Sequence, residues 1–308
     1  MTKLPLPALR AAFGDKLQEN VSLAPYTSAR IGGDADAFII ANSADELEEI
    51  FSRLWEMETP YLLLGGGSNL LISDDGFRGV VVLNKAKEIR FTEGENPGVW
   101  AESGAGLIRV AKQAAQHGLY GLAWAAAIPG TVGGAVYGNA GAFGGDMAGV
   151  LRSTELLTKS GRETWAVRDM RYAYRRSTLK GVTIKAVILS AEITLTEGEQ
   201  VETRAQRSRN IQEQMRSFIR KRKKTQPSGA SMGSMFKNPQ GDYAGRLIEE
   251  AGLKGTRIGN VEISTKHANF FVNHGETKAK DVKALIDLAQ KEVFKKFGVK
   301  LELEIELV

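Results

Sequence analysis

Residues 61–71 read YLLLGGGSNLL, a short apolar run followed by three glycines, a hydroxyl and an amide. Four apolar residues that stop at glycines predict a buried strand that ends in a tight loop. Because consecutive glycines carry no Cβ, their backbone N–H groups can converge on an anion. An ordinary hairpin turn explains the same glycines, so both interpretations stay open for this stretch alone.

A second segment rich in small residues follows at residues 128–144, IPGTVGGAVYGNAGAFG. It suits a loop that lets a flat or phosphorylated cofactor lie against the main chain, with tight packing between strands as the alternative. Neither segment is a Walker loop, and residues 104–109 match G-x-G-x-x-G only until Arg109 replaces the third glycine. Two such segments together predict a dinucleotide site with contacts from Gly65, Gly66, Gly67, Ser68, Asn69, Pro129, Gly130, Thr131, Gly133, Gly134, Asn139 and Gly141.

The composition around these segments is that of a globular protein, with 308 residues, 43% hydrophobic and 25% charged. The absence of cysteine excludes disulfides, thiolate metal sites and a catalytic thiol, and with three histidines we expect no metal site. No apolar leader opens the chain, so we expect a cytoplasmic protein. Residues 113–145 lack charged side chains but hold nine glycines, which indicates a turn-rich segment rather than a membrane span.

Hydrophobic periodicity predicts an α+β fold with many short strands. Helices are expected at residues 43–57, 108–116, 201–224, 243–251 and 281–297, and strands at 61–64, 80–83, 89–92, 99–102, 155–158, 182–195, 269–273 and 299–308. In the last strand, Val299, Leu301, Leu303, Ile305 and Leu307 share one face. A polar break at residues 197–199 predicts two domains, 1–198 and 199–308, and the first is expected to split into two subdomains near residue 58.

The positive charge of the chain is concentrated in one predicted helix. Residues 204–224 contain nine Lys or Arg and one acid, Glu213, so this segment carries +8 and the remainder −3. RNA binding along the helix is one interpretation. Because Phe218 is its one aromatic residue for base stacking, we expect no nucleic-acid partner, and attraction of nucleotide phosphates explains the charge equally well.

Seven segments, in chain order, closely resemble the UDP-N-acetylenolpyruvoylglucosamine reductase family. They are TSARIGG (27–33), GGGSNLL (65–71), IPGTVGGAVYGNAGAFG (128–144), YRRS (174–177), GSMFKNP (233–239), LIEEAGLKG (247–255) and HANFFVN (267–273). Each motif alone is weakly specific, whereas seven in register are very specific. Residues 178–181 alone separate YRRS from the next predicted strand, which resembles the shorter second subclass of the family.

The resemblance implies an FAD-binding domain of the vanillyl-alcohol-oxidase type, in two α+β subdomains, followed by an α+β substrate-binding domain. It also implies the family's reaction in peptidoglycan precursor synthesis. In that reaction NADPH reduces noncovalently bound FAD, and a hydride then passes to the enolpyruvyl group of UDP-N-acetylglucosamine enolpyruvate, which gives UDP-N-acetylmuramate. The UDP-sugar and NADPH are then the expected partners, with no obligate protein partner. An FAD-linked alcohol or sugar oxidase of the same fold is the alternative.

The resemblance also assigns roles to individual residues. Arg175 would hold the substrate carboxylate by a forked contact, Ser234 would donate the proton, and Glu304 would assist the serine. Glu304 shares its strand face with Glu302 and Glu306, and the chain departs from the family pattern at Leu303 and Glu306, where proline and arginine are common. The UDP part of the substrate is expected to contact Tyr174, Lys224 and Asn238.

Overall fold

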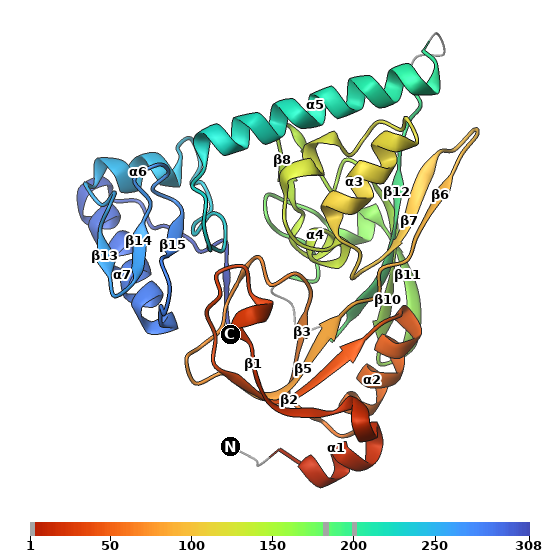
Figure 1. Cartoon of the computed structure of the whole chain (residues 1–308), viewed down its shortest axis with the longest axis horizontal. Helices are drawn as coiled ribbons and strands as arrows, with labels where there is room; N and C mark the ends of the chain where they lie inside the picture. Colours follow the sequence, from red (N-terminus) through yellow and green to blue (C-terminus); the bar gives the residue numbers. More distant parts are fainter. Residues whose placement is uncertain (1–3, 181–184, 199–201) are drawn as a thin grey trace.

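The computed structural model describes residues 4–180, 185–198 and 202–308. Three parts follow one another along the chain: a four-stranded sheet, a five-stranded sheet and a C-terminal part with a three-stranded sheet (Figure 1). The long helix α5 (Arg204–Thr225) extends from the second part to the third. The mixture of short strands and helices confirms the α+β prediction.

The first sheet has the strand order β1-β2-β5-β3, which are Gln18–Ser22, Asp34–Ala41, Phe77–Asn84 and Tyr61–Leu64. β2 and β3 both pair with β5 in parallel, so the chain needs a crossover, and α2 (Ala44–Glu56) supplies it. The Ser43 hydroxyl caps α2 by accepting a hydrogen bond from the Glu46 N–H at 3.1 Å. α1 (Leu6–Phe13) buries Leu9 in the same core.

The first sheet continues to Asn84, well past residue 58, where the sequence predicts a division between two subdomains. β3 and β5 follow residue 58 but complete the sheet that β2 begins. The boundary between the two sheets therefore falls between β5 and β6, because parallel pairing with β5 holds the later strands in the first sheet.

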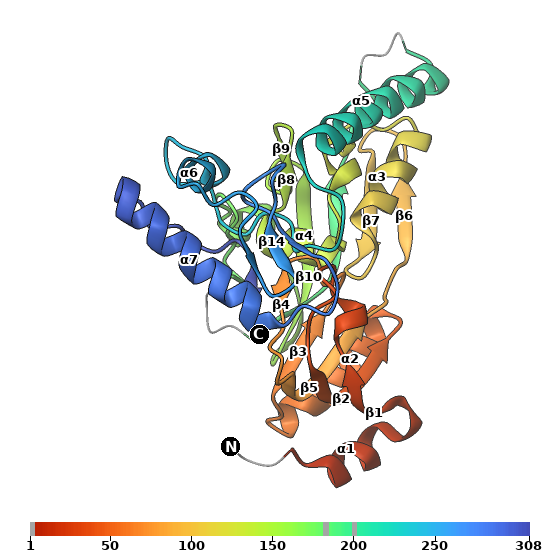
Figure 2. The same cartoon turned by 60° about the vertical axis from the view of Figure 1, so that its left-hand side comes forward.

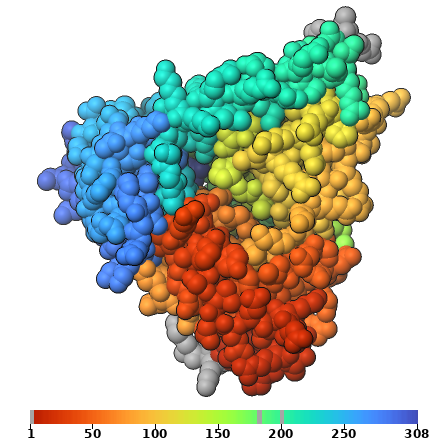
Figure 3. All heavy atoms as spheres, viewed as in Figure 1, coloured from red at the N-terminus to blue at the C-terminus, as the bar shows by residue number. Residues whose placement is uncertain are grey.

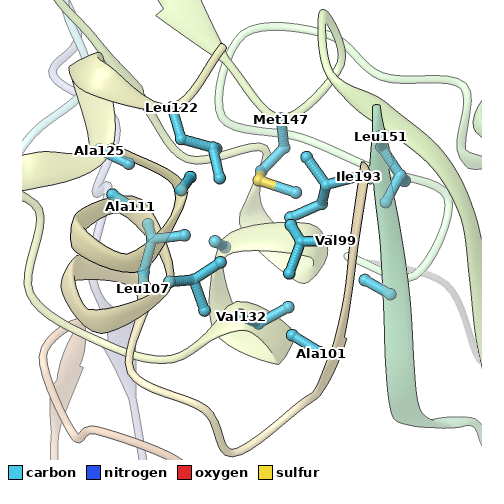
Figure 4. Packing of buried hydrophobic residues seen from close by; sticks show 14 of the residues in the cluster. Val99, Ala101, Leu107, Ala111, Leu122, Ala125, Val132, Met147, Leu151 and Ile193 are labelled. Atoms are coloured by element: carbon cyan, nitrogen blue, oxygen red, sulfur yellow. The ribbon is translucent and has the colours of Figure 1, made fainter. Parts of the chain in front are cut away.

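The second sheet has the order β11-β10-β12-β7-β6 with every neighbouring pair antiparallel. Its strands are Gly161–Ala166, Leu151–Thr158, Val187–Thr194, Gly98–Glu102 and Ile89–Thr92. α3 (Leu107–Gln116), the 3-10 helix η3 (Ala123–Ala127) and α4 (Val132–Gly138) contribute to its core. Figure 4 shows Leu107, Val132 and Met147 meeting the strand residues Val99 and Ile193 in this core.

The uncharged segment at residues 113–145 runs from the end of α3 through η3 and α4 to the hairpin β8–β9 (Gly141–Ala142 and Gly145–Asp146). Its apolar side chains contribute to the core of the second sheet. Among the described residues, no helix combines the length and apolar character that a membrane crossing requires.

α5 packs Ile211 and Met215 into the core of the second sheet. The helix thus follows the predicted domain boundary at residue 198 in the chain, but it packs its apolar face against the second sheet, which precedes that boundary. The boundary itself stays a prediction. The C-terminal part comprises α6 (Ala244–Glu250), strands β13–β15 (Arg257–Ile258, Val261–Ile263, Phe271–Asn273) and α7 (Ala279–Phe297). Figure 2 shows α7 along the outer side of this part.

The end of the chain returns to the first part, where β16 (Glu306–Leu307) pairs in parallel with β4 (Leu70–Leu71). The ten-residue strand predicted at 299–308 is therefore wrong in length, and Leu307 is 49% exposed rather than buried with Leu301 and Ile305. The reason is that the backbone N–H groups of this tail, residues 299–308, go to separate segments. Glu304 donates to Met235 O, whereas Glu306 donates to Asn69 O, both at 2.9 Å.

Two further contacts join the C-terminal part to the first part. The Asp74 carboxylate accepts hydrogen bonds from the N–H groups of Ala279 and Lys280, at 2.7 and 3.0 Å, where α7 begins. This satisfies backbone donors that the N-cap residue Lys278 leaves without a side-chain cap. The Asn273 side-chain amide donates to Ala29 O at 2.8 Å.

Most predicted elements are confirmed to within a few residues, although residues 182–184 of the predicted strand 182–195 and the start of the predicted helix at residue 201 lie outside the described residues. Four 3-10 helices (Gly14–Lys16, Ala24–Tyr26, Ala123–Ala127 and Val167–Met170) complete the described elements.

Candidate active site

The two glycine-rich segments predicted to bind a cofactor contact each other. A Cβ at Gly66 would lie 2.8 Å from the Gly130 Cα, and one at Gly65 would lie 2.7 Å from the Thr131 Oγ1. The Ser68 hydroxyl donates to Pro129 O at 3.3 Å. Because neither glycine can carry a side chain without displacing the other segment, glycine is required here for the close approach of two backbones.

The backbone donors of the first segment fit a phosphate group. Within the described parts of the chain, the N–H groups of residues 66–69 donate to no protein acceptor, whereas the second segment uses several of its donors to start α4. There Thr131 caps the helix by accepting from the Gly134 N–H at 3.4 Å, while the N–H groups of Val132 and Gly133 donate to Ala105 O and Ser103 O in the loop before α3. Among the described residues, the N–H groups of Gly130 and Thr131 have no protein acceptor either. N–H groups beside glycines that have no protein acceptor can bind the pyrophosphate of FAD, so the residues present fit this cofactor.

Asn139, predicted as a cofactor contact, has a structural role for its side chain. It ends α4 in the left-handed region with φ 47°. Its amide donates to Ala173 O at 3.1 Å and its oxygen accepts from the Ala148 N–H at 3.0 Å. The side chain therefore holds the loop that precedes Arg175, and the contact of Asn139 or Gly141 with a cofactor stays a prediction.

Arg175 differs from the other arginines of its segment in where its side chain lies. Arg168, Arg171 and Arg176 are exposed, but the Arg175 side chain is only 24% exposed. Its guanidinium donates to the Glu304 carboxylate at 2.7 Å, to Gly141 O at 2.8 Å and to Asn139 O at 3.3 Å. The predicted carboxylate-binding arginine is thus fixed in orientation by three acceptors.

The structure separates the three glutamates that the sequence placed on one strand face. Glu304 is 18% exposed and pairs with Arg175, while Glu302 is 76% exposed and lies 3.4 Å from the Lys237 Nζ. Glu306 pairs with Lys180 instead. Glu304 is therefore the glutamate that the fold brings to Arg175, and its role beside the serine stays a prediction.

Ser234 is linked to the Arg175–Glu304 pair through the next residue in the chain, Met235. Met235 O accepts the Glu304 N–H at 2.9 Å, and Met235 donates its own N–H to Asn269 O at 2.8 Å. The Asn269 side chain holds the next residue, because it accepts from the Phe236 N–H and donates to Phe236 O. The half-buried Ser234 thus lies in a fixed loop, one residue before the Met235 carbonyl that binds the Glu304 N–H.

The residues predicted to hold the UDP part are less closely joined. Tyr174 is exposed and its ring lies 5.3 Å from the Arg175 guanidinium. Asn238 accepts the Ala244 N–H at 3.1 Å at the start of α6, and Lys224 is exposed in the last turn of α5. Among the described residues, neither a hydrogen bond nor an ion pair joins Lys224 or Asn238 to Arg175, so their roles stay predictions.

Asn69 has a role that the sequence does not reveal. Its side-chain amide donates to Glu304 O at 3.0 Å, and its own carbonyl accepts the Glu306 N–H. A residue of the glycine segment therefore holds the tail that carries Glu304. Figure 3 shows the surface hollowed where the blue C-terminal part meets the yellow-green and red-orange parts.

Comparison with known proteins identifies the family. A model of an FAD binding domain matches residues 35–166, and a model of the UDP-N-acetylenolpyruvoylglucosamine reductase C-terminal domain matches residues 225–308. The UDP-N-acetylenolpyruvoylglucosamine reductase of Chloroflexus aurantiacus is 41% identical over 292 residues, which cover 93% of this chain and 95% of that protein. The chain belongs to the UDP-N-acetylenolpyruvoylglucosamine reductase family.

Other members of the UDP-N-acetylenolpyruvoylglucosamine reductase family show the same extent of similarity. The Bacillus subtilis reductase is 39% identical over 300 residues, covering 95% of this chain and 94% of that protein. The crystal structure of the reductase from Thermus caldophilus superposes with a TM-score of 0.78 at 34% identity, covering 93% of this chain and 97% of that chain.

Membership of the UDP-N-acetylenolpyruvoylglucosamine reductase family confirms the resemblance seen in the seven motifs. The chain is an FAD-dependent oxidoreductase with an FAD-binding domain followed by the family's C-terminal domain. The alternative of an FAD-linked alcohol or sugar oxidase is not favoured, and the assignment to the shorter subclass stays a prediction.

Proposed function

We propose that Arg175, Ser234 and Glu304 carry out the family's reaction, the NADPH-dependent reduction of UDP-N-acetylglucosamine enolpyruvate to UDP-N-acetylmuramate. The observation that supports these roles is the convergence of three distant segments, since Arg175 pairs with Glu304 and the Glu304 N–H binds Met235 O, next to Ser234. Bound FAD, once reduced by NADPH, supplies the hydride for the enolpyruvyl double bond.

Arg175 has donors left for a substrate carboxylate. A guanidinium carries five N–H groups, and three of them donate to Glu304, Gly141 and Asn139. One N–H remains on each terminal nitrogen, which is the arrangement that a forked contact with a carboxylate requires. Because the three protein acceptors fix the guanidinium before substrate arrives, Arg175 can stabilise negative charge without reorienting.

Ser234 is proposed to deliver a proton to the carbon of the enolpyruvyl double bond that does not receive the hydride. A hydroxyl is a poor acid by itself, so its environment must assist the transfer. The Glu304 N–H binds Met235 O, the residue after Ser234, and the Glu304 charge is balanced by Arg175 at 2.7 Å. We assign Glu304 the role of orienting the serine and its proton, and Arg175 that of holding the substrate opposite them.

The remaining assignments concern binding. The glycine segments at residues 65–69 and 129–134 would hold FAD through their main chains, while Tyr174, Lys224 and Asn238 would contact the UDP part of the substrate. The exposed cations of α5 would raise the local concentration of NADPH and the UDP-sugar through their phosphates. We place the reaction in the cytoplasm and assign no nucleic-acid or obligate protein partner.

The reaction can be tested with the purified protein. We expect a yellow protein whose FAD is released by acid precipitation. The native protein should lose its visible absorbance when NADPH is added under argon and regain it when the enolpyruvyl substrate is added. Recovery in the presence of substrate without oxygen would support the reductase. Recovery only on admission of air would contradict it and indicate an oxidase.

A further inference from the structure

Glu306, two residues beyond Glu304, brings together side chains from two other segments. The Lys180 Nζ lies 3.3 Å from the Glu306 Oε1, and both side chains are partly buried. The same Nζ lies 6.0 Å from the centre of the Tyr137 ring. Tyr137 belongs to α4, Lys180 follows the Arg175 loop and Glu306 is in β16, so this Tyr137–Lys180–Glu306 cluster joins three separate segments.

The charges in the cluster complement one another. Burial, together with the neighbouring Glu306 carboxylate, raises the pKa of Tyr137 to about 12. The phenol therefore stays protonated at neutral pH and can donate to Glu306, while Lys180 supplies the opposite charge. In a partly buried pair of this kind, removal of one partner leaves the other charge without compensation.

Two members of the cluster, Tyr137 and Glu306, are also tied through their backbones to the proposed active site. The Ser177 hydroxyl, two residues after Arg175, donates to Tyr137 O at 2.6 Å. Glu306 donates its N–H to Asn69 O, and the Asn69 amide donates to Glu304 O. The Arg175 loop and the Glu304 tail are therefore both fixed to the surroundings of Tyr137.

The backbone of the tail is hydrogen-bonded at several points, but the strand pairing at its end is short. β16 contains two residues and pairs with the two residues of β4, and Leu307 beside Glu306 is exposed. Because side chains alternate along an extended chain, a slip of one residue would turn Glu304 away from Arg175. A side-chain contact near the end of the tail adds to the backbone hydrogen bonds that keep Glu304 at Arg175.

We infer that Glu306 is a positioning residue, whose side chain binds Lys180 and Tyr137 and thereby helps to hold the tail so that Glu304 meets Arg175. This role depends on the roles proposed above for Arg175 and Glu304. Glu306 itself is assigned no contact with substrate or FAD, and the glutamate at which this chain departs from the family pattern thus acquires a function.

Glu302 provides a matched control. It is in the same tail, two residues before Glu304, and pairs with Lys237 at 3.4 Å, but it is 76% exposed. Exposed pairs of this kind contribute little to stability. Glu302→Lys therefore makes the same charge reversal in the same tail with little effect on how the tail is held.

The test compares Glu306→Lys, Glu302→Lys and the double variant Lys180→Glu/Glu306→Lys as FAD-loaded full-length proteins. We expect Glu306→Lys to bind FAD and to be reduced by NADPH at the parent rate, while reoxidation by the enolpyruvyl substrate slows about tenfold. Glu302→Lys should behave as the parent. The double variant restores the opposite charges and should recover most of the reoxidation rate, which a general loss of stability would not allow.

Glu306→Gln removes the charge but keeps an acceptor for Tyr137. It is measured beside Glu306→Lys so that the role of Glu306 is tested even if Glu306→Lys does not fold. We expect Glu306→Gln to show a smaller but selective slowing of the substrate step. Parent rates in Glu306→Gln, equal rates in Glu306→Lys and Glu302→Lys, or no recovery in the double variant would overturn the inference. Those results would leave the roles of Arg175 and Glu304 untouched, because substitutions at those two residues test them separately.

Discussion

Replacement of Arg175 by lysine tests how the proposed carboxylate site works. Lysine keeps the positive charge but presents one compact ammonium group, which cannot reproduce the planar fork of a guanidinium. In the structure the guanidinium uses three donors on Glu304, Gly141 and Asn139 and retains two for substrate. A lysine at this position could satisfy some of these acceptors only by giving up the forked contact.

The expected fall in activity can be calculated from the forked hydrogen bonds that lysine cannot make. Hydrogen bonds to charged groups contribute roughly 1.5–3 kcal/mol each, so removal of the fork should cost about 2–3 kcal/mol of transition-state stabilisation. At about 1.4 kcal/mol per factor of ten, kcat/KM should fall roughly 30- to 150-fold. Much of this fall should appear in kcat, because a guanidinium that stabilises developing negative charge contributes more in the transition state than in the bound substrate.

The assay is steady-state turnover of the FAD-loaded protein at several substrate concentrations, with thermal unfolding to verify that the variant is folded. Arg168→Lys is the matched control, since the Arg168 side chain is 87% exposed and its Nε lies 3.9 Å from the Asp169 carboxylate. We expect parent kinetics for Arg168→Lys. Parent values of both kcat and KM in Arg175→Lys would show that Arg175 does not hold the substrate carboxylate.

Two further substitutions test other parts of the site. Glu304→Gln keeps an acceptor for Arg175 but removes the charge, and we expect kcat to fall by about 10² or more. Glu302→Gln should have little effect on kcat. Equal kcat values in the two variants would show that Glu304 has no special role. Gly66→Val introduces a Cβ 2.8 Å from the Gly130 Cα, so we expect a folded protein without bound FAD. The control is Gly149→Val, which should stay yellow because a Cβ at Gly149 meets only ordinary contacts. A yellow, active Gly66→Val protein would contradict the placement of the cofactor.

Local structure could be predicted well from the sequence because its signals are local. Ser43 caps α2 as expected, and the apolar run at residues 61–64 forms β3. The two glycine segments were predicted to act together, and the structure brings Gly66 against Gly130. In each case a capping residue or an apolar or small-residue pattern within a few positions carries the information.

Selection among similar residues required the fold. Four arginines lie between residues 168 and 176, and without the resemblance only the three acceptors around Arg175 and its lower exposure distinguish it from the others. Glu304 could be separated from Glu302 and Glu306 only by the resemblance, because the alternating pattern of the tail suggests one long strand. The tail instead divides its backbone hydrogen bonds between Met235 and Asn69, which are far apart in the sequence.

Apart from the pairing of the two glycine segments and the residues that the resemblance brought together, contacts between distant segments could not be predicted. Asp74 caps α7 from more than 200 positions away, and no pattern near either segment predicts this contact. The Tyr137–Lys180–Glu306 cluster is similar, since each residue is unremarkable in its own segment. Such contacts depend on how the three parts pack together, and this is set by the cores as a whole.

The most direct test of the proposed mechanism is Ser234→Ala, studied by stopped-flow absorbance at the flavin band. Reduction by NADPH requires no proton delivered to carbon, whereas reduction of the enolpyruvyl group does. The control is Ser228→Ala, at an exposed serine that, like Ser234, lies between α5 and α6. This variant should react as the parent does.

We expect the Ser234→Ala protein to lose its flavin absorbance with NADPH at the parent rate, while reoxidation by the enolpyruvyl substrate slows by roughly 10² to 10⁴, the usual contribution of general acid catalysis. Equal slowing of both half-reactions, or no slowing of the second, would contradict the assignment of Ser234 as the proton donor.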